Sequence, residues 1–129
     1  MEKIGILVLG HGSSLPYNRE LVEKFAEMLS SYNTGVIKTA YLNINKPNIA
    51  ECLESFAGTG VTKIVALPIF LAHGVHTLED IPRELGINKN GFGAIKLNGA
   101  EVPILCAKPL GVDECIANLA YRRAMEAIK

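Results

Sequence analysis

Short apolar runs alternate along the chain with segments in which apolar residues recur every three or four positions. The runs predict buried strands at 3–9, 36–42, 63–71 and 102–106. The helical spacing predicts amphipathic helices at 18–32 and 47–58, a short helix after Thr77, and a closing helix at 113–128. Strands that alternate with helices are typical of a parallel sheet with a helical layer on each face. We therefore predict a three-layer α/β fold with a four-stranded parallel sheet in the order 2-1-3-4.

Glycine is concentrated in the segment from Gly86 to Gly99, which contains four of the twelve glycines of the chain. Within this stretch Asn98-Gly99 separates two short apolar segments, a strong signal for a two-residue β-hairpin. We expect a flexible, glycine-rich hairpin arm outside the parallel sheet. Upstream, proline is favourable at the first position of a helix, so Pro47 is expected to open the second helix.

Length and composition fit one domain that spans residues 1–129. Thirteen Lys and Arg balance thirteen Asp and Glu, so the chain lacks the positive field that collects nucleic acid or an anionic membrane. The longest apolar run is too short to span a bilayer, and the first residues do not resemble a signal peptide. We expect a soluble cytoplasmic protein whose partners include neither nucleic acid nor a membrane.

The three cysteines, Cys52, Cys106 and Cys115, are odd in number and form no CxxC pair. This argues against a disulfide framework and against a thiolate zinc site. We expect them to be buried free thiols.

All three histidines follow predicted strands: His11 after the first, and His73 and His76 after the third. These strands are neighbours in the order 2-1-3-4, and such sheets bind ligands beyond the carboxyl ends of their strands, where the winding reverses. Imidazoles without thiolates suit cobalt, nickel, iron or zinc. The sequence thus predicts a histidine metal site at this edge, to which His73 and His76 both contribute only if their segment makes a helical turn.

Asp80 has two interpretations. It lies four residues after His76, and its carboxylate could accept the second ring N–H of that imidazole. It also lies three residues after Thr77, where it would stabilise the amino end of a helix that Thr77 caps. We favour the second interpretation.

The loop at Gly10-His11-Gly12 also permits a phosphoryl-transfer hypothesis. Histidine phosphatases carry their nucleophile on a similar loop in an Arg-His-Gly motif. Here Gly10 replaces the arginine, so the expected phosphate clamp is missing, and the loop has no P-loop lysine. Activity on a generic phosphate ester would favour this hypothesis.

Two separated motifs carry a resemblance to a known family. The segment GHGS-x-LPY at 10–17 and the segment P-x-FLAHG-x-H-x-x-x-DIP at 68–82 resemble those of the short-form class II chelatases. These are single-domain, CbiX-like sirohydrochlorin chelatases of archaea, which insert cobalt or nickel into the macrocycle. The resemblance extends over nearly the whole chain, including the glycine-rich arm and the AKPLG-x-DE stretch at 107–114.

The resemblance implies a set of functional residues. His11 and His76 would be the catalytic residues and the ligands of the substrate metal, Co²⁺ or Ni²⁺, whereas His73 falls at a position that is not counted as a ligand. The protein would have no permanently bound cofactor, and it would act as a homodimer. The tetrapyrrole site would include the loop Leu71, Ala72, His73, Gly74, Val75 and His76.

One position departs from the family pattern. Many relatives have Glu-x-x-Glu-Pro after the second strand, where this chain has Asn43-Ile44-Asn45-Lys46-Pro47. Lys46 is either a solvated residue at the start of a helix or a contact for a carboxylate of the macrocycle. The remaining alternative is a metal-carrying module without turnover, which would bind the ion but never deliver it to a tetrapyrrole.

Overall fold

The computed structural model describes residues 2–32, 35–75, 77–88 and 90–129. Five strands and four helices occupy them, and they alternate as the sequence predicts except for two consecutive strands before the last helix. The elements are β1 (Ile4–Gly10), α1 (Tyr17–Leu29), β2 (Val36–Tyr41), α2 (Ile49–Ser55), β3 (Lys63–Pro68), α3 (Thr77–Leu85), β4 (Gly93–Leu97), β5 (Ala100–Cys106) and α4 (Glu114–Ile128). No helix among the described residues is long and apolar enough to cross a membrane.

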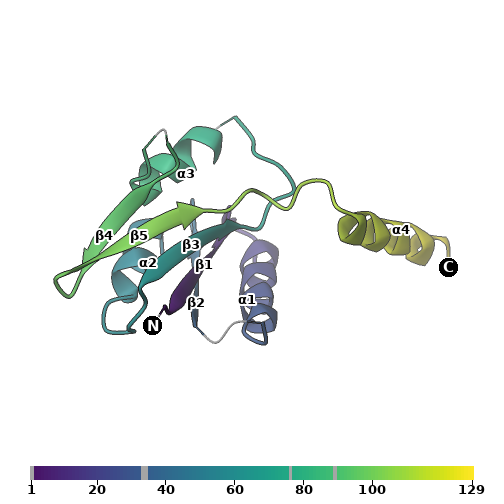
Figure 1. Ribbon diagram of the computed structural model, residues 1–129. Helices are drawn as coiled ribbons and strands as arrows, with labels where there is room; N and C mark the ends of the chain where they lie inside the picture. Colours follow the sequence, from purple (N-terminus) through teal and green to yellow (C-terminus); the bar gives the residue numbers. More distant parts are fainter. Residues whose placement is uncertain (1, 33–34, 76, 89) are drawn as a thin grey trace.

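The sheet has five strands in the order β2-β1-β3-β5-β4 (Figure 1). The strands β2, β1, β3 and β5 are parallel and follow the predicted order. Their continuous apolar runs are typical of parallel strands that lie between helical layers. The prediction of four strands was wrong. The glycine-rich arm supplies β4, which pairs antiparallel with β5 and makes the sheet mixed.

The turn between β4 and β5 confirms the predicted two-residue hairpin. Asn98 and Gly99 both have positive φ, 51° and 82°, which matches the right-handed twist of the flanking strands. The hairpin is therefore part of the sheet and not a separate arm.

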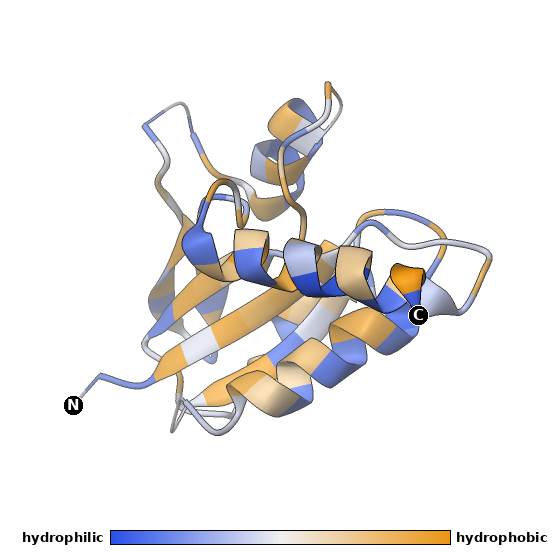
Figure 2. Ribbon diagram, turned by 90° about the vertical axis from the view of Figure 1, so that its right-hand side faces the viewer, coloured by the Kyte–Doolittle hydropathy of each residue, from blue (hydrophilic) through white to orange (hydrophobic). Residues whose placement is uncertain are grey.

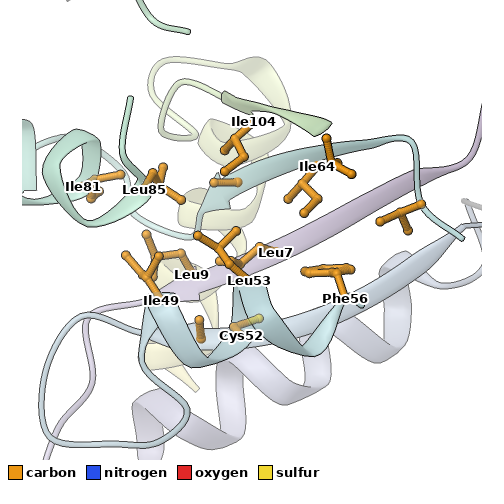
Figure 3. Packing of buried hydrophobic residues seen from close by; sticks show 14 of the residues in the cluster. Leu7, Leu9, Ile49, Cys52, Leu53, Phe56, Ile64, Ile81, Leu85 and Ile104 are labelled. Atoms are coloured by element: carbon orange, nitrogen blue, oxygen red, sulfur yellow. The ribbon is translucent and has the colours of Figure 1, made fainter. Parts of the chain in front are cut away.

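The two faces of the sheet are covered unequally. On one face, α2 and α3 pack over the strands and form the larger core, of which Figure 3 shows Leu7, Ile49, Phe56 and Ile81. The other face carries a small cluster under α1. It consists of Val8, Val22 and Tyr41. Neighbouring strand residues point to opposite faces, which is why Leu7 and Val8 belong to different cores.

Helix α2 begins later than predicted. Asn48 is its N-cap, and its side chain accepts a hydrogen bond from the Glu51 N–H while Glu51 bonds back to the Asn48 N–H. This reciprocal capping box places Pro47 outside the helix. Helix α4 begins as predicted, since the Asp113 carboxylate accepts from the Cys115 N–H at 2.8 Å.

The cysteines are free, but only one of them is buried. Cys52 lies in the larger core, where burial raises the pKa of its thiol to about 11. Cys106 and Cys115 are exposed, contrary to the expectation of three buried thiols. They lie at the end of β5 and at the start of α4.

Candidate functional site

His11 lies where β1 ends, at the carboxyl edge of the sheet. The residue is exposed, and its ring stacks on that of Phe70, with centroids 4.1 Å apart and planes 28° apart. Phe70 is 7% exposed and follows β3, the neighbour of β1. The stack holds the imidazole at the junction of the two strands that the sequence analysis placed side by side.

Three hydrogen bonds, to α1 and to the segment after β2, fix the His11 loop. The Gly12 N–H donates to Asn18 Oδ1 of α1 at 2.9 Å, and the Ser13 N–H donates to Asn45 Oδ1 at 2.8 Å. The Asn43 N–H donates to the His11 carbonyl at 3.0 Å. The segment that departs from the family pattern at Lys46 therefore also supports the His11 loop, through Asn43 and Asn45.

The two glycines of this loop leave no room for side chains. Gly12 has a φ of 86°, and a Cβ there would overlap the carbonyl oxygen of Asn43. A Cβ on Gly10 would come within 2.5 Å of the Val22 side chain and 2.9 Å of Asn18 Oδ1. An arginine at position 10 would not fit, so the loop is closed to the phosphate clamp that the phosphatase hypothesis requires.

The second loop follows β3 and is far more open. Leu71, Ala72, His73, Gly74 and Val75 are all exposed. The Thr77 hydroxyl, which is buried, accepts from the Gly74 N–H at 2.8 Å and lies 3.3 Å from His73 Nδ1. This local turn orients His73, but it does not tie the tip of the loop to the sheet.

His76 lies outside the described residues. The structure therefore brings His11 and the His73 loop to the same edge of the sheet and leaves the His76 prediction open. Within the described ranges, no group of three or more His, Cys, Asp or Glu side chains is placed to hold a metal ion. A closed cage is thus not formed by the part of the chain that the structure describes.

A cleft of about 600 Å³ opens beside His73, between α3 and the chain that follows β5. Apolar side chains make up much of its lining, and a carboxylate and an ammonium group flank them. The lining includes His73, Leu78, Glu79, Ile87, Cys106 and Lys108. Such a cleft suits a flat organic ligand with anionic substituents.

Lys46 and Asp80 both have ion-pair partners nearby in the chain. The Lys46 ammonium lies 3.4 Å from Glu51 Oε1, and its side chain is 76% exposed. Asp80 Oδ1 accepts from Arg83 at 2.8 Å, one turn along α3. The Thr77 hydroxyl bonds to Gly74 and so contributes to the turn before α3, while Asp80 stands in the first turn of the helix.

Sequence reasoning missed three residues that position His11. Phe70 was quoted within a motif but given no role, although an aromatic residue just after a central strand lies at the ligand edge of such a sheet. Asn18 and Asn45 carried no signal of their own, because their bonds to the loop span 6 and 32 residues of sequence.

An open α/β sheet with helices on both faces belongs to the doubly wound class, in which ligands bind at the carboxyl edge, where His11 lies. The CbiX family model matches residues 5–127 of the chain. The chain belongs to the CbiX family.

Two relatives illustrate the similarity within the family. The sirohydrochlorin cobaltochelatase of Methanosarcina barkeri is 46% identical over 128 residues, which cover 98% of each chain. That of Saccharolobus solfataricus is 38% identical over 123 residues, with coverage of 95% of this chain and 94% of its own.

Solved structures share the fold. A CbiX protein of Marinobacter aquaeolei, named for cobalamin (vitamin B12) biosynthesis, superposes with a TM-score of 0.68 at 26% identity, covering 96% of this chain and 95% of its own. SirB from Bacillus subtilis, solved with Fe³⁺, gives a TM-score of 0.75 at 27% identity, and the match covers 94% of this chain but 46% of SirB. The SirB chain is thus about twice as long.

Proposed function

We propose that the protein is a sirohydrochlorin cobaltochelatase, a lyase that inserts Co²⁺ into the macrocycle. The observation that carries the proposal is the setting of His11, an exposed imidazole stacked on Phe70 in a loop that is bonded to α1 and to the segment after β2. The family and its relatives supply the substrate class, since the Methanosarcina barkeri relative carries this activity in its name.

In this proposal the protein supplies only two ligands to the metal ion. His11 and His76 bind the incoming ion and leave its other positions open to the nitrogens of the macrocycle. A site of two imidazoles holds a divalent ion weakly enough to release it, whereas a closed cage of four ligands would retain it.

Insertion also displaces two pyrrole protons, one from each of two N–H groups that become metal ligands. An imidazole that has just given up the ion has a free ring nitrogen, which can accept such a proton. His11 and His76 therefore serve first as ligands and then as bases in the same turnover.

The macrocycle binds over the loop Leu71–His76 and the neighbouring cleft. The apolar lining of the cleft supports the flat ring, and Lys108 at its rim pairs with a ring carboxylate. Lys46, whose side chain is exposed, is the second candidate for such a pair.

Nickel is the alternative substrate metal. Imidazole accepts both ions, and their affinities follow the ion more than the site. We place cobalt first because the relatives from Methanosarcina barkeri and Saccharolobus solfataricus are both named for it.

A homodimer completes this proposal. The His11 loop and the His73 loop lie on one open edge of a small domain, which leaves a bound macrocycle uncovered on its outer side. A second copy related by a two-fold axis would supply that cover.

The decisive experiment follows the absorption spectrum of sirohydrochlorin with Co²⁺, Ni²⁺ or Fe²⁺, with and without protein. We expect the protein to accelerate insertion of Co²⁺ the most, and His11→Ala to remove most of that acceleration. Equal rates with and without protein for every metal would reject a chelatase. Metal binding in the same sample without any insertion would leave the carrier module as the function.

A further inference from the structure

Ile44, in the segment after β2, has a backbone conformation that isoleucine rarely adopts. Its φ is 66°, in the left-handed region, where the branched side chain of an isoleucine crowds the neighbouring backbone. Asparagine accepts this region far more readily, as Asn98 does in the β4–β5 hairpin with a φ of 51°. Asparagines also stand on both sides of Ile44, yet the isoleucine occupies the unfavourable position. The backbone at Ile44 is therefore strained.

Hydrogen bonds to the His11 loop hold this strained turn in place. The Asn45 N–H donates to the Asn43 carbonyl at 2.6 Å, which closes a three-residue γ-turn with Ile44 at its centre. The Asn43 N–H donates to the His11 carbonyl at 3.0 Å. At the other end of the turn, Asn45 Oδ1 accepts from the Ser13 N–H at 2.8 Å. Both ends are thus tied to the loop that carries His11, and Ile44 has a defined position beside it.

Packing within the domain does not account for the isoleucine. Its side chain is 72% exposed and belongs to neither core cluster. The bonds that close and anchor the turn use atoms of Asn43 and Asn45, so Ile44→Asn would keep them all. Strained backbone is concentrated at ligand sites, where the surrounding structure maintains it for a function. The exposed side chain is the part of Ile44 that such a function would use.

Two more exposed apolar side chains lie on neighbouring loops. Leu15 belongs to the loop after β1, and Leu71 belongs to the loop after β3. Because β2, β1 and β3 are adjacent and parallel, the three loops leave the sheet at the same edge. Figure 2 shows apolar positions, in orange, among the hydrophilic ones in the loops at this edge. We call Leu15, Ile44 and Leu71 the apolar rim.

The size and charge of this region suit a flat ligand with anionic groups. Adjacent strands lie about 4.8 Å apart, so three neighbouring loops span roughly 10 Å, more than a single small side chain would cover. Lys46, two residues after Ile44, exposes a positive charge next to the rim. A tetrapyrrole with carboxylate substituents has an apolar ring for the rim and anions for the lysine.

We propose that Ile44 is a substrate-contact residue, whose strained turn presents an apolar side chain to the macrocycle beside His11. This role depends on the proposed function, because the macrocycle is the ligand. When the ring binds, it removes the isoleucine side chain from water, and this burial stabilises the complex. The sequence thus combines a less stable turn with tighter substrate binding, a common compromise at binding sites.

Thermal unfolding gives the first test, because it measures the strain. Ile44→Asn should raise the melting temperature by about 3 °C, since asparagine accepts the positive φ. Ile44→Val keeps a branched Cβ and should stay within about 1 °C of the parent. A melting temperature that is unchanged or lower in Ile44→Asn would show that the turn is not strained and would overturn the proposal.

Binding of metal-free sirohydrochlorin, followed by absorption titration, gives the second test. Ile44→Asn should raise the Kd about tenfold, because the complex loses an apolar contact. Ile44→Val removes one methylene group and should raise the Kd about fourfold or less. Equal or tighter binding by Ile44→Asn would overturn the proposal.

Met28→Asn is the matched control for this titration. Met28 is also an exposed apolar residue, but it lies near the far end of α1, roughly 16 Å along the helix from the end that follows the His11 loop. The same change of side-chain polarity there should leave the Kd within about twofold of the parent. A Kd that rises equally in Met28→Asn and Ile44→Asn would remove the assignment of a contact to Ile44.

Binding of Co²⁺ without the macrocycle separates a substrate contact from support of the His11 loop. Ile44→Asn keeps the bonds between the turn and that loop, so its Co²⁺ affinity should stay within about twofold of the parent. A loss of Co²⁺ affinity as large as the loss for sirohydrochlorin would show that Ile44 acts through His11, against the proposal. A parent that binds sirohydrochlorin but inserts no metal would reject the chelatase alone, whereas a parent that does not bind it would overturn both.

Discussion

The two histidine loops at the carboxyl edge of the sheet are built in opposite ways. The His11 loop is bonded to α1 and to the segment after β2, and its ring stacks on Phe70. The loop after β3 is exposed from Leu71 to Val75, and its hydrogen bonds at Gly74 are local. One loop is held by distant parts of the fold, whereas the other, past the bond from the Gly111 N–H to the Leu71 carbonyl, is held among its described residues by its own turn.

This difference fits a division of labour in the proposed reaction. A ligand held at a fixed position costs little ordering free energy when the metal arrives. A loop with few ties can follow the macrocycle as it binds and leaves. His11 on the fixed loop would thus give the ion a defined position, while the open loop, which carries the second proposed ligand His76, would adjust to the substrate.

The largest expected effect comes from replacing one glycine in each loop and comparing the two losses of stability. Gly12→Ala should lower the free energy of unfolding by about 3 kcal/mol, because a positive φ costs about 1–2 kcal/mol and the overlap with Asn43 adds a similar amount. Gly74→Ala meets no atom within 4 Å and should change it by less than about 0.5 kcal/mol. Urea denaturation of both variants measures the contrast, and equal losses would mean that the loops are equally constrained.

The second contrast concerns the imidazoles. His11→Ala should slow cobalt insertion about 100-fold or more, since a metal ligand at the fixed position is lost, which corresponds to about 2.7 kcal/mol in the barrier. His73→Ala should slow it less than about 10-fold. Rates are compared after circular dichroism has shown both variants folded. A reversed order would make His73, and not His11, the ligand that matters for insertion.

Asn45 tests whether the support of the fixed loop matters for turnover. Asn45→Ala removes the acceptor of the Ser13 N–H, and a lost hydrogen bond of about 1 kcal/mol should lower kcat roughly fivefold while KM changes little. Asn45→Asp keeps an acceptor oxygen there and should restore most of the rate. If aspartate fails to rescue while the protein remains folded, the amide itself has a role other than holding the loop.

Sequence alone predicted the parts of the fold that continuous patterns specify. The apolar runs of β1 and β3 identified the two central strands, and the Asn98-Gly99 turn identified the hairpin. The incorporation of β4 into the sheet was missed because a short glycine-rich segment gives little β signal, and its pairing depends on β5.

The sequence predicted the edge of the sheet at which the candidate site lies, but not the contacts that hold its side chains and loops. Strand order placed the histidines at one edge, since neighbouring strands end there. The stack of His11 on Phe70 and the bond from Ser13 to Asn45 join distant parts of the chain, and no periodicity encodes them. The exposure of α4, none of whose residues is buried, was equally hidden, because its own pattern predicts an ordinary amphipathic helix.

The smallest expected effect lies at Lys46, beside the fixed loop. Sirohydrochlorin carries many carboxylates, so if Lys46 pairs with one, Lys46→Glu should raise KM about threefold at low salt and less at high salt, because exposed charges are screened within about 10 Å at 0.1 M. Lys24→Glu is the matched control: Lys24 lies 3.5 Å from Glu27 and is 73% exposed, much as Lys46 lies 3.4 Å from Glu51 and is 76% exposed. Both variants break a pair with a glutamate and change the net charge equally, so a KM that rises only for Lys46→Glu identifies a substrate contact. An unchanged KM at both salt concentrations would make Lys46 a solvated residue, and the segment after β2 would then act on the site through Asn43, Ile44 and Asn45 alone.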